Sequence, residues 1–369
     1  MRFLPRSRWS WRWLALLAGV AVLASVPAIV AAMPAPGREV AAADLLGRVR
    51  ASGPVAYQGY AESRAGLGLP DVPRVGRVVA LLGETTRMRA WVRSPTAWRV
   101  DELTAIGERD TYQDARGTWE WDSGERRASR TGGEAAVRLA RPADLLPPEL
   151  GRRLAAAAEP GEARRLGSRR VAGVTAAGLR IVPRSPDTTV GRVDLWADPR
   201  TGLPLRVEVT ARGAHAPILT TAFLDLRQTA PGNEAVTFHL PLDAEVENDE
   251  APDLARAIDR FSPFVLPSDL AGLPRRTLVG RAAGTFGQGF EVVAALAFPA
   301  GYSPRTQAVL DAVPQVKGPW GEAGLVTTPL LNALVFDRSG VAYALAGTVP
   351  PRVLERVATQ LARNGAAPA

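Results

Sequence analysis

Aliphatic and polar residues alternate on both sides of a tight turn near the middle of the chain. Residues 193–197 and 205–209 each place an aliphatic side chain at every second position, which is the period of a half-buried strand. Between them lies Asp198-Pro-Arg-Thr-Gly202, in which proline presets φ for the first corner of a turn and glycine accepts a positive φ. The pattern predicts a β-hairpin. Because this hairpin has no catalytic residue, the function is expected to lie in what the surrounding sheet encloses.

Similar short segments before and after the hairpin predict a long antiparallel meander. Turn sequences such as Asp114-Ala-Arg-Gly117 separate the segments, and few helices interrupt them. Helices are expected at 40–49 and at 143–158, where Pro147-Pro148 starts or kinks the second helix. The expected strands are residues 55–63, 75–82, 86–93, 97–103, 107–113, 118–121, 126–130, 163–166, 168–174, 177–182, 219–226 and 236–240.

The chain after residue 260 has a different pattern, which predicts a small α+β domain. Strands are expected at 277–283, 289–298, 330–336 and 341–348, helices at 303–313 and 350–361, and a loop at 264–274. The fold class is therefore α+β, beginning with an N-terminal membrane anchor or signal sequence over residues 1–37. A curved antiparallel half-barrel sheet with a covering helix follows over 38–242, then an acidic linker over 243–262, the small domain over 263–364, and a disordered tail over 365–369.

The first 37 residues have the pattern of a membrane-inserted segment. Four arginines precede an uncharged stretch, and Leu14–Ala32 is long enough to cross a bilayer at about 1.5 Å per residue. The arginines would keep the N-terminus cytoplasmic and place the domains outside. Val30-Ala-Ala32 is also an acceptable cleavage site, so a secreted form is the alternative to a single-pass membrane protein. The length of the segment favours the uncleaved anchor.

Composition narrows the functional classes. The chain has no cysteine, and its two histidines, His215 and His239, stand singly among apolar or small residues. Gly284-Thr-Phe-Gly-Gln-Gly289 has the wrong spacing for a dinucleotide loop, and no nucleophile motif or metal cluster stands out. No catalytic residue, metal ligand or cofactor is therefore predicted, and the sequence indicates a binding protein and not an enzyme.

The formal charge of +8 does not indicate a nucleic-acid partner. Without the four arginines that precede the N-terminal apolar segment, 41 basic and 37 acidic residues remain. A nucleic-acid interface needs a clustered basic face, whereas these residues are scattered.

Large apolar residues on the expected strands suggest a ligand site. If the concave face of the curved sheet is unfilled, the helix at 143–158 would act as a lid over an acyl chain or a lipid-modified peptide, held by burial at about 25 cal/mol per Å². An ordinary packed sheet core is the other interpretation. The candidate cavity residues are Met88, Val100, Trp119, Trp121, Trp196 and Phe223, and the lid residues are Leu145, Leu146, Leu150 and Leu154.

The order helix, meander, single helix, meander resembles the LolA/LolB/RseB superfamily of extracytoplasmic lipoprotein carriers and sigma-factor regulators. The pattern x-Asp-Pro-x-Thr-Gly-Leu-Pro-x-x-Val at 197–207 is one matching stretch. Actinobacterial LolA-like proteins are most similar over residues 40–242, and residues 330–361 resemble the smaller C-terminal domain of MucB/RseB-type proteins. The other matching stretches are Gly66–Pro70, Trp91–Val100, Thr118–Trp121 and Phe238–Pro241.

This resemblance implies a half-open barrel with an apolar cavity and no catalysis, and it adds Trp98 to the cavity-lining residues. LolA-like members shuttle lipoproteins from a membrane transporter, and RseB-like members bind an anti-sigma factor and sense mislocalised lipoprotein or glycolipid. An anchored chain would be a tethered acceptor, sensor or regulator. Two functions are therefore expected: a carrier, acceptor or envelope sensor that takes a lipid or acylated lipoprotein, or a regulator that docks an anti-sigma factor without a lipid ligand.

Overall fold

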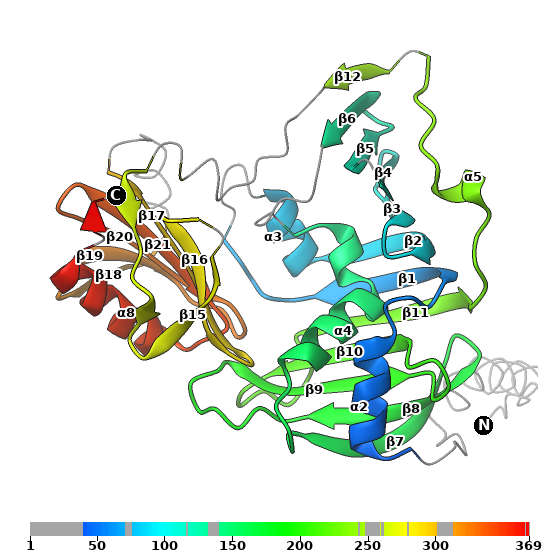
Figure 1. Ribbon diagram of the computed structural model, residues 1–369, viewed down its shortest axis with the longest axis horizontal. Coiled ribbons are helices and arrows are strands. Elements are labelled where there is room, and N and C mark those ends of the chain that lie inside the picture. The colour runs from blue at the N-terminus through cyan, green and yellow to red at the C-terminus, as the bar shows by residue number, and fades with distance from the viewer. Residues whose placement is uncertain are drawn as a thin grey trace, which may run out of the picture.

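Two antiparallel sheets, each in its own domain, make up the computed structural model of this chain (Figure 1). The structure describes residues 40–70, 76–115, 117–131, 140–242, 244–247, 259, 262–278, 280–300, 313–365 and 367–368. Within these residues, the amino-terminal domain contains a 12-stranded sheet and the carboxy-terminal domain an 8-stranded sheet. The predicted α+β class, with a large sheet domain followed by a smaller α+β domain, is confirmed.

Strand β1 lies at the centre of the 12-stranded sheet, because it pairs with both β2 and β11. The strands from β2 to β6 extend from one side of it and those from β11 back to β7 from the other, and β12 closes the β6 edge in parallel. The strands are β1 (Tyr57–Ala65), β2 (Thr85–Ser94), β3 (Ala97–Leu103), β4 (Glu108–Asp114), β5 (Gly117–Asp122), β6 (Arg127–Thr131), β7 (Ala163–Val171), β8 (Val174–Ile181), β9 (Val190–Ala197), β10 (Pro204–Ala211), β11 (Leu219–Arg227) and β12 (Glu245–Glu247).

Helical segments cover one face of this sheet, which we call the helix-covered face. Helix α2 (Ala42–Ala51) contacts β7 and β8, α4 (Pro147–Ala157) contacts β10, α3 (Gly76–Gly83) contacts β1, and the short helix η1 (Pro142–Leu145) contacts β2 and β3. A run of buried aliphatic residues on α2 and on the strands beneath it forms the core under α2 and α4; it includes Leu45, Val49, Leu179, Leu195 and Val207.

The smaller domain packs one helix on its sheet. The apolar stripe predicted on α8 (Pro351–Asn364) is buried against the sheet and includes Val353, Val357 and Leu361. The sheet consists of β14 (Asp269–Leu270), β15 (Leu273–Leu278), β16 (Ala283–Gln288), β17 (Glu291–Pro299), β18 (Gln315–Gly318), β19 (Gly321–Val326), β20 (Asn332–Arg338) and β21 (Val341–Gly347), and β13 (Phe264–Val265) pairs separately with β22 (Ala367–Pro368).

The loop between β8 and β9 joins the two domains. The Thr189 hydroxyl donates to the Leu330 carbonyl oxygen at 2.6 Å, and the Asp187 carboxylate forms ion pairs of 2.6 Å with Arg352 and Arg356 on α8. Phe290, from the smaller domain, is buried in the same core as α2. The two domains therefore share apolar and polar contacts at one junction.

Several sequence expectations differ from the structure. The expected strand at 75–82 is helix α3, because β1 pairs directly with β2 and leaves no place for another strand; its short apolar run fits either structure. The expected strand at 236–240 is replaced by α5 (Asn233–Val236) and an irregular segment, whose Phe238 packs on aromatic rings. The expected strand at 277–283 is divided between β15 and β16. The expected helix at 143–158 breaks into η1 and α4 at Leu146, since Pro147 and Pro148 begin a new helix.

Other expectations concern the two ends of the chain and residues 303–313. The predicted anchor over 1–37 and the predicted helix at 303–313 lie outside the described residues, apart from Val313. Among the described residues, no helix combines the length and hydropathy needed to span a bilayer. The tail predicted to be disordered includes β22, which pairs with β13.

The predicted hairpin has the expected turn, and its glycine also sets the position of α2. Gly202 has a φ of +73°, and a methyl group there would overlap the Arg48 carbonyl of α2. The Arg48 guanidinium donates a hydrogen bond to the Pro199 carbonyl of the same turn. Gly213 has a similar φ of +80°, but no atom lies within 4 Å of the position of its missing Cβ.

These two glycines give a matched test. Gly213→Ala is expected to lower the free energy of unfolding by about 1–2 kcal/mol, which is the cost of a left-handed backbone. Gly202→Ala is expected to lower it by about 2–4 kcal/mol, because a steric clash with α2 is added. Urea unfolding of both variants measures the difference, and equal losses would contradict the packing of α2 on the turn.

Candidate functional site

Strand register places four of the seven candidate cavity residues on the helix-covered face. Met88 on β2 pairs with Ala61 on β1, which in turn pairs with Phe223 on β11, so these side chains leave the sheet on the same side. Val100 and Trp98 on β3 are opposite Ala90 and Val92 and point to the same side. Met88, Val100 and Phe223 are at most 2% exposed, and Trp98 is half-buried against them.

Register directs the other three candidates to the opposite face of the sheet, and Trp196 nevertheless belongs to the same buried cluster as Met88 and Phe223. Trp119 pairs with Tyr112, Trp121 pairs with Asp110, and Trp196 pairs with Arg206. The face of a strand depends on its register with every intervening strand, which one strand's own pattern does not contain. Trp119 stacks on Phe238 at 4.8 Å between ring centroids, and Trp196 lies beneath the guanidinium of Arg169.

The four predicted lid residues also divide into two groups. Leu145 and Leu146 pack on Met88 and its neighbours and are at most 5% exposed, whereas Leu150 and Leu154 pack in the core beneath α2. Gly151 holds α4 close to the sheet, since a methyl group there would lie 2.7 Å from Pro204. The part of the cover that lies over Met88 is therefore η1 and Leu146, which we call the lid segment (residues 142–146).

Beyond β3 the helix-covered face becomes charged. A cleft of about 240 Å³ lies over β4–β6. Arg109 and Asp122 form an ion pair of 2.6 Å there, and Glu120 lies 3.8 Å from Arg77 of α3. An apolar wall thus adjoins a polar rim, an arrangement that suits a ligand with an apolar body and a polar end.

Three hydroxyl groups on the helix-covered face are buried without a hydrogen-bond partner among the described residues. They belong to Tyr57, Ser63 and Thr221. Burial raises the pKa of Tyr57 well above its usual range, so the phenol keeps its proton. A buried unpaired hydroxyl costs about 1–3 kcal/mol. The sequence pattern did not indicate these groups; its only signal is that Ser63 and Thr221 occupy apolar positions of their strands.

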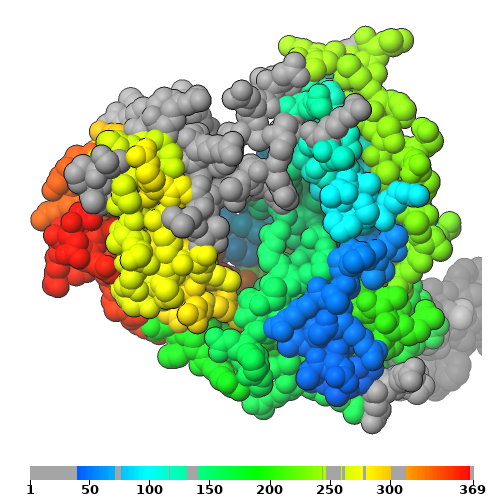
Figure 2. Space-filling model, in the orientation of Figure 1, coloured from blue at the N-terminus to red at the C-terminus, as the bar shows by residue number. Residues whose placement is uncertain are grey.

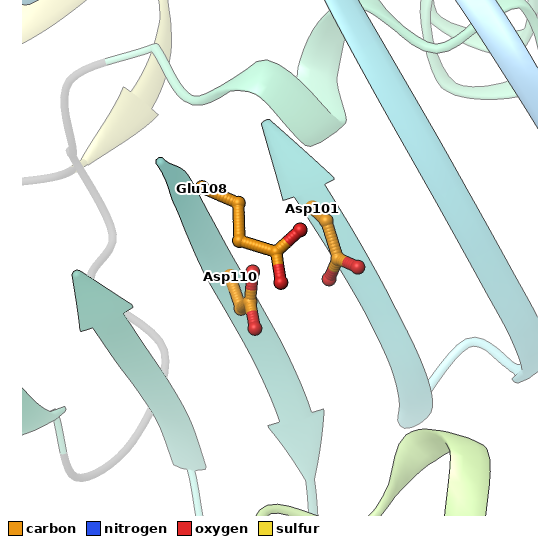
Figure 3. Close-up of side chains that lie close together, drawn as sticks. All are labelled: Asp101, Glu108 and Asp110. Carbon is orange, nitrogen blue, oxygen red and sulfur yellow. The ribbon is translucent and has the colours of Figure 1, made fainter. Parts of the chain in front are cut away.

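A buried carboxylate cluster lies on the opposite face (Figure 3). Asp101 on β3 is opposite Asp110 on β4, and Glu108 stands two residues before Asp110, with carboxylate oxygens of all three within 4.8 Å of one another. Such oxygens are ligands for a hard cation. Here the Arg99 guanidinium donates to Asp101 at 2.5 and 2.9 Å and to Asp110 at 3.1 Å, so the chain itself supplies the positive charge. The cluster fits a structural ion-pair network better than a metal centre.

A second cleft, of about 510 Å³, lies at the junction of the two domains. Glu159, Glu162 and Arg184 line it from the first domain, and Gln288 and Phe290 from the second. Figure 2 shows the surface hollowed between the yellow residues of the smaller domain and the green residues of the larger one.

Residues 128–252 match the family model of the MucB/RseB N-terminal domain. Over this segment the chain is similar to that domain. The match, which extends over about a third of the chain, confirms the resemblance predicted from the sequence.

Solved structures with similar folds include MucB, in its complex with MucA(peri), at 18% identity and a TM-score of 0.49, covering 86% of this chain and 97% of that chain. The Pseudomonas aeruginosa MucA/MucB complex is similar at 17% identity and a TM-score of 0.49, with coverages of 86% and 96%. A LolA superfamily protein from Nitrosomonas europaea is similar at 11% identity and a TM-score of 0.25, with coverages of 54% and 99%. No curated protein sequence matches this chain.

The carboxylate cluster predicts a pH dependence of stability. Burial, together with the charge of Asp101, raises the pKa of Asp110 to about 7. The folded chain therefore retains a proton that the unfolded chain loses near pH 4, and stability falls as the pH rises from about 4 to about 7. Asp110→Asn is expected to remove this loss and to be more stable than the wild type at about pH 8, by about 1–2 kcal/mol.

Asp122→Asn is the control of opposite sign. Burial acts to raise the pKa of Asp122, but hydrogen bonds from Arg109 and backbone amides outweigh it and lower the pKa. The ionised Asp122 carboxylate therefore stabilises the folded chain at neutral pH, and this stabilisation disappears in acid. The Asp122→Asn variant is expected to be less stable than the wild type at about pH 7. Urea titrations across pH measure both effects. An Asp110→Asn variant that is less stable than the wild type at about pH 8 would contradict the raised pKa of Asp110.

Proposed function

We propose that the chain is an extracytoplasmic, non-enzymatic binding protein that holds an acyl chain between its helix-covered face and the lid segment. The ligand is a lipid or the lipid modification of a protein, and the N-terminal segment anchors the domains at the outer surface of the cell membrane. The observation that carries the proposal is the apolar wall of Met88, Val100 and Phe223 beneath Leu145 and Leu146.

The construction of the lid segment supports this proposal. Leu146 lies between η1 and α4 with an extended ψ of 139°. Its amide donates to the Ala143 carbonyl of η1 and its carbonyl accepts from the Leu150 amide of α4, so the two helices meet at this residue without forming one continuous helix, and Pro147 and Pro148 lack donors. The segment is held by polar bonds, since Asp144 accepts from the Arg141 amide and from the Arg153 guanidinium, both at 2.9 Å. These bonds can break without unfolding α4.

The energetics also favour exchange of the lid segment for a ligand. Opening exposes the side chains of Leu145 and Leu146 and the wall beneath them. An acyl chain that buries roughly 300 Å² gains about 7 kcal/mol at about 25 cal/mol per Å², enough to compensate for the lost lid contacts. No polar anchor is required for binding of this strength.

A charge placed on the wall tests the proposal. Trp98→Glu is expected to weaken binding of an acylated probe at least about tenfold, because the new carboxylate would be buried against the acyl chain of the probe. Trp91→Glu is the matched control: Trp91 is also half-buried, on the neighbouring strand, but its register with Arg99 places it on the opposite face. Equal binding by the two variants would contradict the location of the site.

Docking of a membrane-bound protein partner, such as an anti-sigma factor, is the second candidate function. The cleft at the domain junction favours it, because two domains line it and it has room for a peptide segment. Gln288, at the exposed end of β16, lies on this cleft.

The two candidate functions predict that different variants lose binding. If partner docking is the function, Gln288→Trp is expected to abolish recovery of a single-span protein from native membranes, and Trp98→Glu is expected to preserve it. Lipid analysis of the same samples completes the test, because the docking function predicts no lipid that purifies with the chain.

A further inference from the structure

Two of the buried hydroxyls lie side by side on the helix-covered face. Ser63 on β1 pairs directly with Thr221 on β11, and both side chains are 0% exposed. Among the residues that the structure describes, neither hydroxyl has a hydrogen-bond partner, so the two do not bond one another.

The surroundings of this pair are apolar except for Thr86 on β2, which is opposite Ser63 and buried. The next residues along the same face are Ala61 and Phe223, and Val207 on β10 is opposite Thr221. Alanine and valine would fill the same space without a polar group, and packing alone therefore gives no reason for the two hydroxyls. An acceptor brought by a ligand would satisfy both.

The geometry points to a particular acceptor. Side chains that face one another across two strands have Cβ atoms about 5 Å apart, so two hydroxyl donors can converge on one oxygen with two lone pairs. A carbonyl oxygen is such a group. Its attached chain would continue along the wall that begins at Ala61 and Met88.

Burial decides between an acid and an ester. Ser63 and Thr221 are both 0% exposed, and a carboxylate placed beside them would lose its hydration, at a cost that two hydroxyl donors do not recover. A neutral acyl ester offers the carbonyl oxygen without the charge. We infer that Ser63 and Thr221 bind the ester carbonyl of an acyl lipid and thereby set how deeply the acyl chain enters beneath the lid segment. This inference rests on the proposed function.

Two probes of equal chain length, methyl palmitate and hexadecane, test the inference. The measurement is the rise in melting temperature that each probe causes in the full-length protein in maltoside micelles, converted to relative affinity. The wild type is expected to bind the ester about tenfold more tightly than the alkane, as two hydrogen bonds predict. In Ser63→Ala/Thr221→Val, this advantage is expected to disappear while alkane binding and the melting temperature without probe are maintained.

Thr210→Val is the control. Thr210 is 2% exposed, but its register with Arg192 places it on the opposite face, so both affinities should remain those of the wild type. An ester advantage that persists in the double variant, or equal binding of both probes by the wild type, overturns the role of the hydroxyls and leaves acyl binding established. A wild type stabilised by neither probe contradicts the proposed function itself.

Discussion

The 12-stranded sheet buries one of its faces beneath α2, α3, α4 and the lid segment. Because β1 joins both halves of the meander, a single face passes from the apolar core under α2 and α4 to the wall of Met88 and Phe223. Near its centre this face is covered by the lid segment, which ends where Pro147 and Pro148 begin α4. The same burial that stabilises the sheet therefore creates a surface that an acyl chain can occupy when that segment moves.

The two domains contribute differently to this arrangement. The loop from β8 to β9 fixes the smaller domain beside α4 through Asp187 and Thr189, and Phe290 extends the core across the junction. The junction also creates a cleft that neither domain has alone. The candidate lipid site in the first domain and the candidate protein site at the junction are thus separate surfaces of the same chain.

The sequence predicted the meander, the hairpin at 193–209 and the apolar stripe of α8, because these depend on local periodicity and turn residues. It did not predict α3, since an apolar run of eight residues fits a buried strand as well as a helix. The assignment of Trp119, Trp121 and Trp196 to the cavity required the register of several strands, which is a property of the whole sheet. The unpaired hydroxyls of Ser63 and Thr221 are likewise visible only when the covering helices are in place.

Lipid extraction and mass spectrometry of the full-length protein, purified from its native membranes, would show whether an acyl chain occupies the helix-covered face. We expect a stoichiometric acyl-ester lipid or an acylated peptide that purifies with the wild type and is lost from the Trp98→Glu variant. A folded wild-type protein that purifies without lipid, together with a stoichiometric protein partner, would contradict the account and support docking at the domain junction.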